Sequence, residues 1–111
     1  MNKVVLVGRL TKDPELRFAA GSGSAVCRFT VAVNRQFKKD ETDFINCTLW
    51  RGIAESTAEY CKKGDLVGIK GRIQTSNYQD SEGNKKYTTE VVAEKVTFLS
   101  KNHTKEAEET E

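Results

Sequence analysis

The sequence predicts an all-β domain with one short inserted helix, on three observations. Apolar and polar residues alternate over most of the chain, with the period of two that is typical of half-buried strands. Only residues 54–63 (AESTAEYCKK) place apolar side chains at helical spacing. The 111 residues are enough for one domain with a modest core. We therefore expect a single domain over residues 1–99 and a short, acidic, disordered tail over residues 100–111.

The N-terminal part of the chain contains two strand patterns. Residues 3–10 (KVVLVGRL) are rich in valine, and Gly8 among them indicates a bend or a close backbone approach. Residues 15–18 fit a short extension of this first strand. Residues 25–35 (AVCRFTVAVNR) form a second, longer strand, which a polar loop carrying Phe37 connects to the next.

The central strand, residues 43–50 (DFINCTLW), has two unlike faces. Its apolar face is formed by Ile45, Cys47 and Leu49. The opposite face is polar in the middle, yet it begins with Phe44 and ends with Trp50, the only tryptophan. An aromatic ring on a solvent-exposed face lacks the stabilisation of roughly 1.5–3 kcal/mol that its burial would give. We expect a subunit, a ligand or a nucleobase to cover these rings; the alternative is packing under a loop or against another sheet.

The C-terminal part begins with the expected helix over residues 54–63. Lys62 and Lys63 would occupy its last turn and Gly64 its C′ position. Two strands follow, over residues 65–78 and 87–99, joined by a hairpin whose tip is residues 80–86.

The pattern of the last strand also predicts a β-bulge. Its apolar phase switches from odd to even positions between Val92 and Lys95, which is typical of a β-bulge. Three strands, a helix and two more strands are the element order of the OB-fold. This fold is a five-stranded Greek-key barrel with the helix between strands 3 and 4, and it binds oligonucleotides on a sheet face and its loops.

Composition argues against several classes of protein. The cysteines, Cys27, Cys47 and Cys61, are odd in number and lie at apolar-phase positions, which favours buried, reduced thiols in a cytoplasmic protein. No close pair of metal ligands exists and His103 is the only histidine, so we expect neither a metal nor another cofactor. We recognise no signal peptide and no apolar run of membrane-spanning length, and expect a cytoplasmic, nucleoid-associated protein.

The charge distribution favours an acidic partner for the body of the chain. Residues 1–99 hold 16 Lys and Arg against 12 Asp and Glu, whereas residues 100–111 hold two Lys against four Glu. Single-stranded nucleic acid requires cations along its phosphates and flat rings on which bases stack, at about 1–3 kcal/mol per base. The candidate stacking residues are Phe37, Phe44, Trp50 and Tyr78. The candidate phosphate-binding residues are Arg9, Arg17, Arg35, Lys38, Lys39, Arg51, Lys70, Arg72, Lys85 and Lys86. No constellation of catalytic side chains is recognisable, so we expect no enzyme and no catalytic residues.

Four segments of the chain resemble the bacterial-type single-stranded DNA-binding protein family. They read NKVVLVGRLTKDPELRF, DFINCTLWRGIAE, AEYCKKGDLVGIKGRI and YTTEVVAEKV, and the resemblance covers residues 1–99. It implies a homotetramer of OB-folds that binds single-stranded DNA without sequence preference in replication, recombination and repair. The family's four stacking positions match Phe37, Phe44, Trp50 and Tyr78, with the ring types permuted.

The end of the sequence departs from the family pattern. Full-length members carry a Gly/Gln/Pro-rich linker and an acidic tip with Ile-Pro-Phe that recruits partner enzymes. This sequence ends in KEAEETE, which is acidic but lacks that tip. We expect either a short form, such as a phage-encoded or second-copy version, or a shortened chain. The resemblance therefore does not extend to recruitment of replication and repair proteins through such a tip.

Two alternative functions stay open on the sequence. One is a dimeric primosomal protein of replication restart on the same OB-fold, which a mass measurement would distinguish from a tetramer. The other is an OB-fold protein-interaction module whose aromatic faces are interfaces and whose acidic tail is the working part. We predict sequence-independent single-stranded DNA binding and protection.

Overall fold

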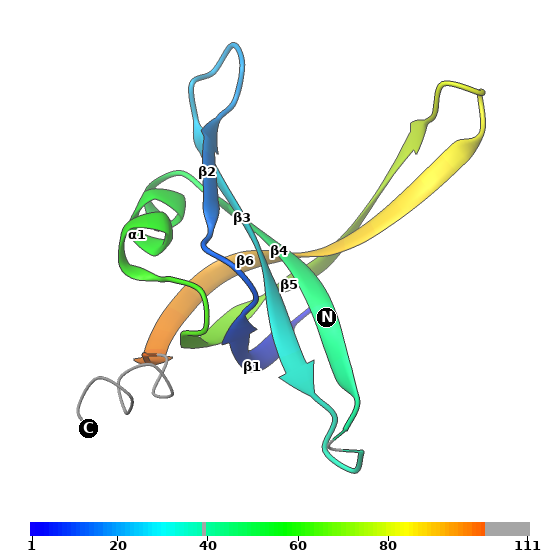
Figure 1. Ribbon diagram of the computed structural model, residues 1–111. Helices are drawn as coiled ribbons and strands as arrows, with labels where there is room; N and C mark the ends of the chain where they lie inside the picture. The colour runs from blue at the N-terminus through cyan, green and yellow to red at the C-terminus, as the bar shows by residue number, and fades with distance from the viewer. Residues whose placement is uncertain (39, 102–111) are drawn as a thin grey trace.

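The computed structural model describes residues 1–38 and 40–101, which form six strands and one helix (Figure 1). The elements are β1 (Val4–Leu10), β2 (Glu15–Phe18), β3 (Ala25–Asn34), β4 (Thr42–Trp50), α1 (Gly52–Tyr60), β5 (Leu66–Gln79) and β6 (Lys85–Ser100). The tail was predicted to begin at residue 100, but Ser100 belongs to β6. Residues 102–111 of that tail and the candidate Lys39 lie outside the described residues. The mostly β fold and the position of its one helix confirm the predicted fold class.

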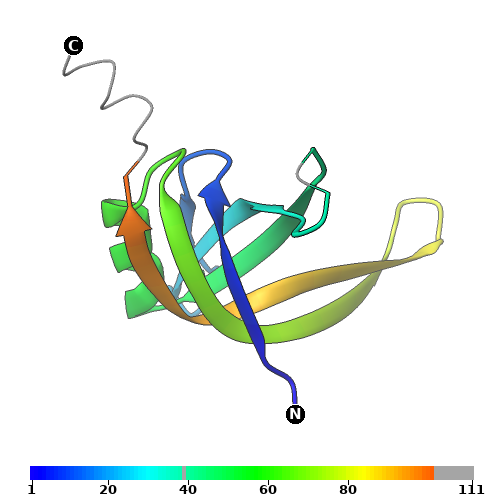
Figure 2. The ribbon, with the colours of Figure 1, turned by 90° about the horizontal axis from the view of Figure 1, so that it is seen from below.

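Five of the strands close into a ring. The sheet runs in the order β1-β5-β6-β4-β3-β2, and a further β1–β3 pairing at Arg9 and Leu10 joins its ends. Residues 15–18 were predicted to extend the first strand, but they form the separate strand β2, which pairs with β3. β5 and β6 continue past the ring as a two-stranded arm, residues 74–90, which projects from the barrel (Figure 2).

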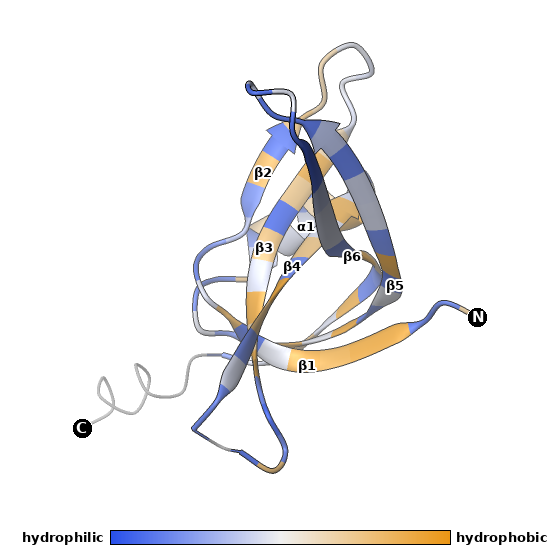
Figure 3. Cartoon of the chain, turned by 90° about the vertical axis from the view of Figure 1, so that its right-hand side faces the viewer, coloured by the Kyte–Doolittle hydropathy of each residue, from blue (hydrophilic) through white to orange (hydrophobic). Residues whose placement is uncertain are grey.

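The core fills the barrel with the apolar faces that the alternation predicts. Cys47 and Leu49 of β4 are buried, as are Cys27 and Val31 of β3, and Ile45 is half-buried against them. Apolar and polar residues alternate along β3 in Figure 3. The opposite phase of β4 points outward, so one strand both builds the core and presents side chains to solvent.

The predicted bulge in the last strand is present, and a glycine of β5 lies opposite it. Lys70 pairs with Lys95 whereas Gly71 pairs with Ala93, so Glu94 is skipped. A Cβ on Gly71 would lie 2.2 Å from the carbonyl oxygen of Val92, so the bulge requires glycine there. The close approach predicted at Gly8 is also present, because a Cβ there would lie 2.6 Å from the Ala32 carbonyl oxygen.

The predicted end of the helix is wrong. α1 ends at Tyr60, so Lys62 and Lys63 are not in its last turn and Gly64 is not at its C′ position. The N–H of Lys62 donates to Oδ2 of Asp65 at 2.9 Å, and the N–H of Lys63 donates to Oδ1 of Asp13 at 2.8 Å. These bonds hold residues 62–65 in a separate turn, which helical propensity alone does not reveal.

The three cysteines are free and buried, as predicted. Burial raises the pKa of Cys27 from its ordinary value of 9.0 to about 11 and that of Cys47 to about 12, with smaller contributions from the charges of Cys61 and Glu90 respectively. Burial also raises the pKa of Cys61. All three thiols are therefore neutral near pH 7 and poorly nucleophilic.

The raised pKa values predict a loss of stability in alkali. Above pH 9 the unfolded thiols ionise while the folded ones keep their protons, so the free energy of unfolding falls as pH rises from 9 toward 11–12. Urea denaturation across this range measures the slope. Cys47→Ala is the control, because it lacks the group with the pKa of about 12. An unchanged slope in this variant would contradict the assignment.

Candidate nucleic-acid interface

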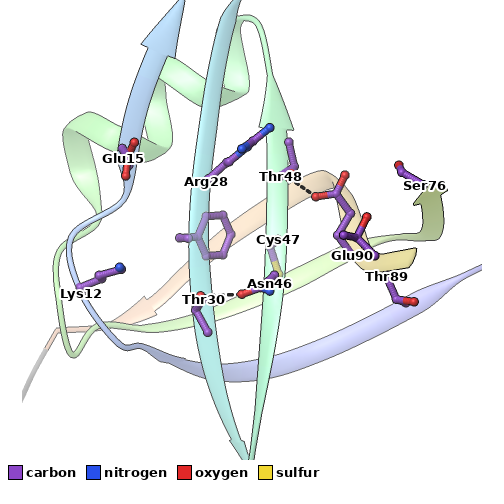
Figure 4. A pocket seen from close by; sticks show the side chains of 12 residues that line it. Lys12, Glu15, Arg28, Thr30, Asn46, Cys47, Thr48, Ser76, Thr89 and Glu90 are labelled. Atoms are coloured by element: carbon purple, nitrogen blue, oxygen red, sulfur yellow. Dashed lines mark hydrogen bonds between the residues drawn. The ribbon is translucent and has the colours of Figure 1, made fainter. Parts of the chain in front are cut away.

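A groove of about 470 Å³ lies between the outward face of β3 and β4 and the arm (Figure 4). Arg28 pairs across the strands with Thr48, and Thr30 pairs with Asn46, so all four share one sheet face. The polar side chains that line the groove are Lys12, Glu15, Arg28, Thr30, Asn46, Thr48, Ser76, Thr88, Thr89 and Glu90. The lining is polar and open, which suits a ligand rich in hydrogen-bonding groups.

Two aromatic residues stand at the ends of this sheet face. Phe44 is 67% exposed and Trp50 is 46% exposed, so both residues keep a large accessible surface for a ligand. The two residues are six positions apart on β4, which separates them by about 20 Å along an extended strand. The face between them is the polar floor of the groove, so a bound molecule could contact both rings and the floor.

Tyr78 and Phe37 extend the aromatic series beyond β4. Tyr78 is 55% exposed and lies on the same strand face as Ser76, which lines the groove. Phe37 is 92% exposed in the loop between β3 and β4. Trp50 thus lines the second hollow, Phe44 and Tyr78 each lie two positions from a groove-lining residue of their own strand, and Phe37 lies on the loop between β3 and β4.

A second hollow, of about 290 Å³, adjoins the groove next to Trp50. Arg17, Val26 and Trp50 form one row across β2, β3 and β4, so Arg17 and Trp50 lie on the same face. Arg17 contacts Glu15 in an exposed ion pair. Arg28 lines both the hollow and the groove, and so lies where the two meet.

The predicted phosphate-binding residues occupy unlike positions. Arg51 follows Trp50 directly and is exposed, with an unusual backbone φ of 65° where β4 turns into α1. The side chains at even positions of β5 share one strand face, and they include Lys70, Arg72, Ser76 and Tyr78. Other exposed cations are Lys38 in the Phe37 loop, Lys86 opposite Tyr78, and Lys85 on the reverse face of the arm.

Several of these cations have partners within the chain: Arg17 contacts Glu15, Lys86 lies 4.0 Å from Asp80, and Nη1 of Arg72 donates to Gln74 at 2.9 Å. Arg35 and Arg9 are held as well. Nη1 of Arg35 donates to Glu41 at 2.7 Å and Nη2 donates to Asp43 at 2.9 Å. The hydrogen bond from Arg35 holds the pKa of Asp43 below its ordinary value. Nη1 of Arg9 donates to the carbonyl oxygen of Gly64 at 2.9 Å. Arg35 therefore braces the loop that carries Phe37, and a phosphate would have to compete with two carboxylates for it.

The sequence did not predict most of the polar residues that form the floor of the groove. Thr48 is 3% exposed, and its hydroxyl donates to Oε2 of Glu90 at 2.7 Å. The hydroxyl of Thr30 donates to Oδ1 of Asn46 at 2.9 Å. Arg28 was recognisable as outward-facing from the alternation of its strand. Nothing in the sequence indicates that Glu90, on the last strand, meets Thr48 across the β4–β6 pairing.

The described residues do not favour other kinds of site. Residues 1–38 and 40–101 contain no group of three or more His, Cys, Asp or Glu side chains placed to hold a metal ion. Within the same residues, no helix has the length and apolar character needed to cross a membrane.

Comparison with known proteins gives consistent matches. The profile described as the Single-strand binding protein family matches residues 1–99. A single-stranded DNA-binding protein of Clostridium perfringens (strain 13 / Type A) is 59% identical over 99 residues, which cover 89% of this chain and 66% of the relative. Single-stranded DNA-binding protein B of Bacillus subtilis (strain 168) is 56% identical over 102 residues, which cover 88% of this chain and 89% of the relative.

The chain thus spans just under two thirds of the length of the clostridial relative and most of the length of the bacillar one. These matches confirm the resemblance that the sequence motifs indicated. The family comprises DNA-binding proteins without enzymatic activity, which agrees with the prediction of a non-enzyme. On the match over residues 1–99 and these identities, the chain belongs to the single-strand binding protein family.

Proposed function

We propose that this chain binds single-stranded DNA without sequence preference, the activity after which its family is named, and so protects it during replication, recombination and repair. The observation that carries the proposal is the outward face of β4. Phe44 and Trp50 stand exposed at its two ends, with a polar groove between them. Exposed rings beside polar groups suit bases, whose faces stack and whose edges form hydrogen bonds.

Phe37, Phe44, Trp50 and Tyr78 act as stacking platforms in this proposal. Their exposure supports it, because each of the four residues keeps between 46% and 92% of its surface accessible to a ligand. Stacking tolerates any base, which gives binding without sequence preference. The strand would run along the outward face of β4 and onto the arm, and the domain that does this work is residues 1–99.

The phosphates are neutralised by exposed cations around the groove. Arg17 and Arg51 flank Trp50, and Lys86 lies opposite Tyr78 on the arm. Lys38, Lys70, Arg72 and Lys85 add positive charge nearby, and Lys39 belongs to the predicted set although it lies outside the described residues. Arg9 and Arg35 contribute mainly through their long-range field, because Arg35 donates to two carboxylates and Arg9 to a backbone carbonyl oxygen. The exposed ion pairs of Arg17 and Lys86 each involve a single carboxylate, which a phosphate can replace.

Self-association into a homotetramer is part of the proposal. Val5 and Val7 are 74% and 53% exposed on the outer face of β1, where burial in another subunit would be favourable. β3 pairs with β1 only at Arg9 and Leu10, which leaves the preceding edge of β1 accessible to a second chain. Protein partners in replication and repair would meet the assembled oligomer.

Phosphate neutralisation predicts a measurable dependence on salt. The logarithm of the binding constant for oligo-dT should fall linearly with the logarithm of salt concentration, by roughly 0.7 per phosphate neutralised. Arg51→Gln is expected to reduce that slope by about 0.7, because one contact is lost. Fluorescence anisotropy of labelled oligo-dT at several salt concentrations measures it.

The matched control is Lys3→Gln, which removes an equal charge from an exposed residue outside the predicted set. Its slope should stay close to that of the original chain. Equal slopes in the Arg51→Gln variant and the original chain would remove Arg51 from the contact set. Absence of oligo-dT binding at low salt would refute the proposed function itself.

A further inference from the structure

Two oppositely charged side chains occupy the floor of the groove, and neither stacking nor phosphate neutralisation accounts for both. Arg28 extends from β3 toward Thr48, and the carboxylate of Glu90 reaches Thr48 from the arm (Figure 4). We propose that Arg28 and Glu90 form a subsite that reads the edge of a base and favours guanine. This inference rests on the proposed function and adds one preferred position to otherwise sequence-independent binding.

Glu90 is held in a fixed place. Its Oε2 accepts the hydroxyl of Thr48 at 2.7 Å, and Thr48 is buried in the sheet. The carboxylate keeps further lone pairs on both oxygens for a ligand. Because it is half-buried at the groove wall, a strand entering the groove would meet it at close range.

Arg28 is free to bind a ligand. Its side chain is exposed and lines both the groove and the adjoining hollow. Among the ion pairs within the described residues none includes Arg28, although Glu15 is its cross-strand neighbour and contacts Arg17 instead. No ion pair joins Arg28 to Glu90 either, so the two groups do not neutralise each other by direct contact.

The carboxylate determines which part of the DNA can occupy the floor. A phosphate placed beside Glu90 would bring two negative charges together, whereas an N–H of a base would give the carboxylate a hydrogen bond. The floor therefore suits bases, with the phosphates at the rim beside Arg17, Arg51 and Lys86. The hydroxyl and amide groups of Thr30 and Asn46 fit the same use.

Guanine best complements this pair of groups. Its O6 and N7 atoms accept two hydrogen bonds from an arginine guanidinium, which is the commonest specific contact of arginine with a base. Its N1–H and N2–H groups can donate to the two oxygens of one carboxylate. Thymine offers a carboxylate only a single N–H, and adenine lacks the O6 acceptor. One site that presents both an arginine and a carboxylate therefore favours guanine.

The test compares oligonucleotides that differ in one base. The reference is the shortest oligo-dT that binds, and its central thymine is replaced in turn by guanine, hypoxanthine or 7-deazaguanine. A single guanine avoids four-stranded structures. We expect the guanine oligonucleotide to bind about fivefold more tightly than the reference, a modest value for one exposed base contact. Hypoxanthine, which lacks the N2 amino group, and 7-deazaguanine, which lacks N7, should each lose part of that gain.

Substitutions at Glu90 and Arg28 test which side chain contacts which atoms of guanine. Glu90→Gln should reduce the difference between guanine and hypoxanthine, because the amide loses the charge and one acceptor oxygen. Arg28→Gln should reduce the difference between guanine and 7-deazaguanine, because the shorter, neutral amide replaces the guanidinium. The ratio of two affinities cancels any general change in phosphate attraction. Glu94→Gln is the matched control, since Glu94 is an exposed residue of the same strand at the bulge, and it should preserve both differences.

The outcomes separate this inference from the proposed function. Tight and equal binding of all four oligonucleotides would refute the subsite and leave single-stranded DNA binding intact. A guanine preference that persists undiminished in both Glu90→Gln and Arg28→Gln would also refute it, because the preference would arise elsewhere. Failure to bind any of the oligonucleotides would overturn both proposals.

Discussion

Replacing Trp50 and Phe44 together by alanine is expected to abolish most of the affinity for single-stranded DNA. Each lost stacking platform costs about 1–3 kcal/mol per base, so the pair should cost about 2–6 kcal/mol, or at least roughly 30-fold in the dissociation constant. The cost in stability should be smaller than that of a core substitution, because Phe44 is 67% exposed and Trp50 is 46% exposed. Anisotropy with labelled oligo-dT measures the affinity, and urea denaturation measures the stability.

Two controls make this result specific. Tyr60→Ala removes a ring that is 71% exposed on α1 and lies outside both hollows, and it should leave affinity unchanged. Trp50→Phe keeps a flat ring and should retain most of the binding. If affinity survived in the double alanine variant, the aromatic face would serve as a protein interface, and the interaction-module alternative would be favoured.

Leu49→Ala is expected to destabilise the fold by about 2–5 kcal/mol, the usual cost of removing a large buried side chain from a core. Leu49 is fully buried, directly next to the exposed Trp50 in sequence. Chemical denaturation at a fixed protein concentration measures the change, since association of subunits would make stability depend on concentration.

The matched control is Leu16→Ala on β2, where the leucine is 37% exposed and the loss should be much smaller. At temperatures where the Leu49→Ala protein stays folded, its affinity for oligo-dT should be close to that of the original chain. A Leu49→Ala protein as stable as the original would contradict the division of β4 into a core face and a binding face.

Much of the fold is predictable because strand alternation is a local signal. The period of two along β4 assigned Leu49 to the core and left Phe44 and Trp50 outside, and the structure agrees. The phase switch in the last strand placed a bulge between Val92 and Lys95, and the structure shows that Glu94 is the skipped residue, which inverts the two faces. The helix was found by its spacing, but its end was not, because the side chains of Asp13 and Asp65 determine it.

The site is only partly predictable because the groove joins segments that are distant in sequence. The aromatic residues stand out as apolar residues on polar segments, so each can be found from its own neighbours. Glu90 reaches Thr48 across 42 positions of sequence, and no local pattern indicates that contact. The acids around Arg35 were visible in the sequence, but their convergence on its guanidinium follows from the geometry of the hairpin.

The fluorescence of Trp50 tests the central claim most directly, because it is the only tryptophan and lines the hollow that adjoins the groove. Titration with oligo-dT at low and high salt, with a duplex of equal length as control, reports whether a base reaches its ring. The proposed function predicts strong quenching by the single strand alone, with a midpoint that moves to higher DNA concentration as salt rises. Equal quenching by the duplex, or no quenching by either, would contradict it.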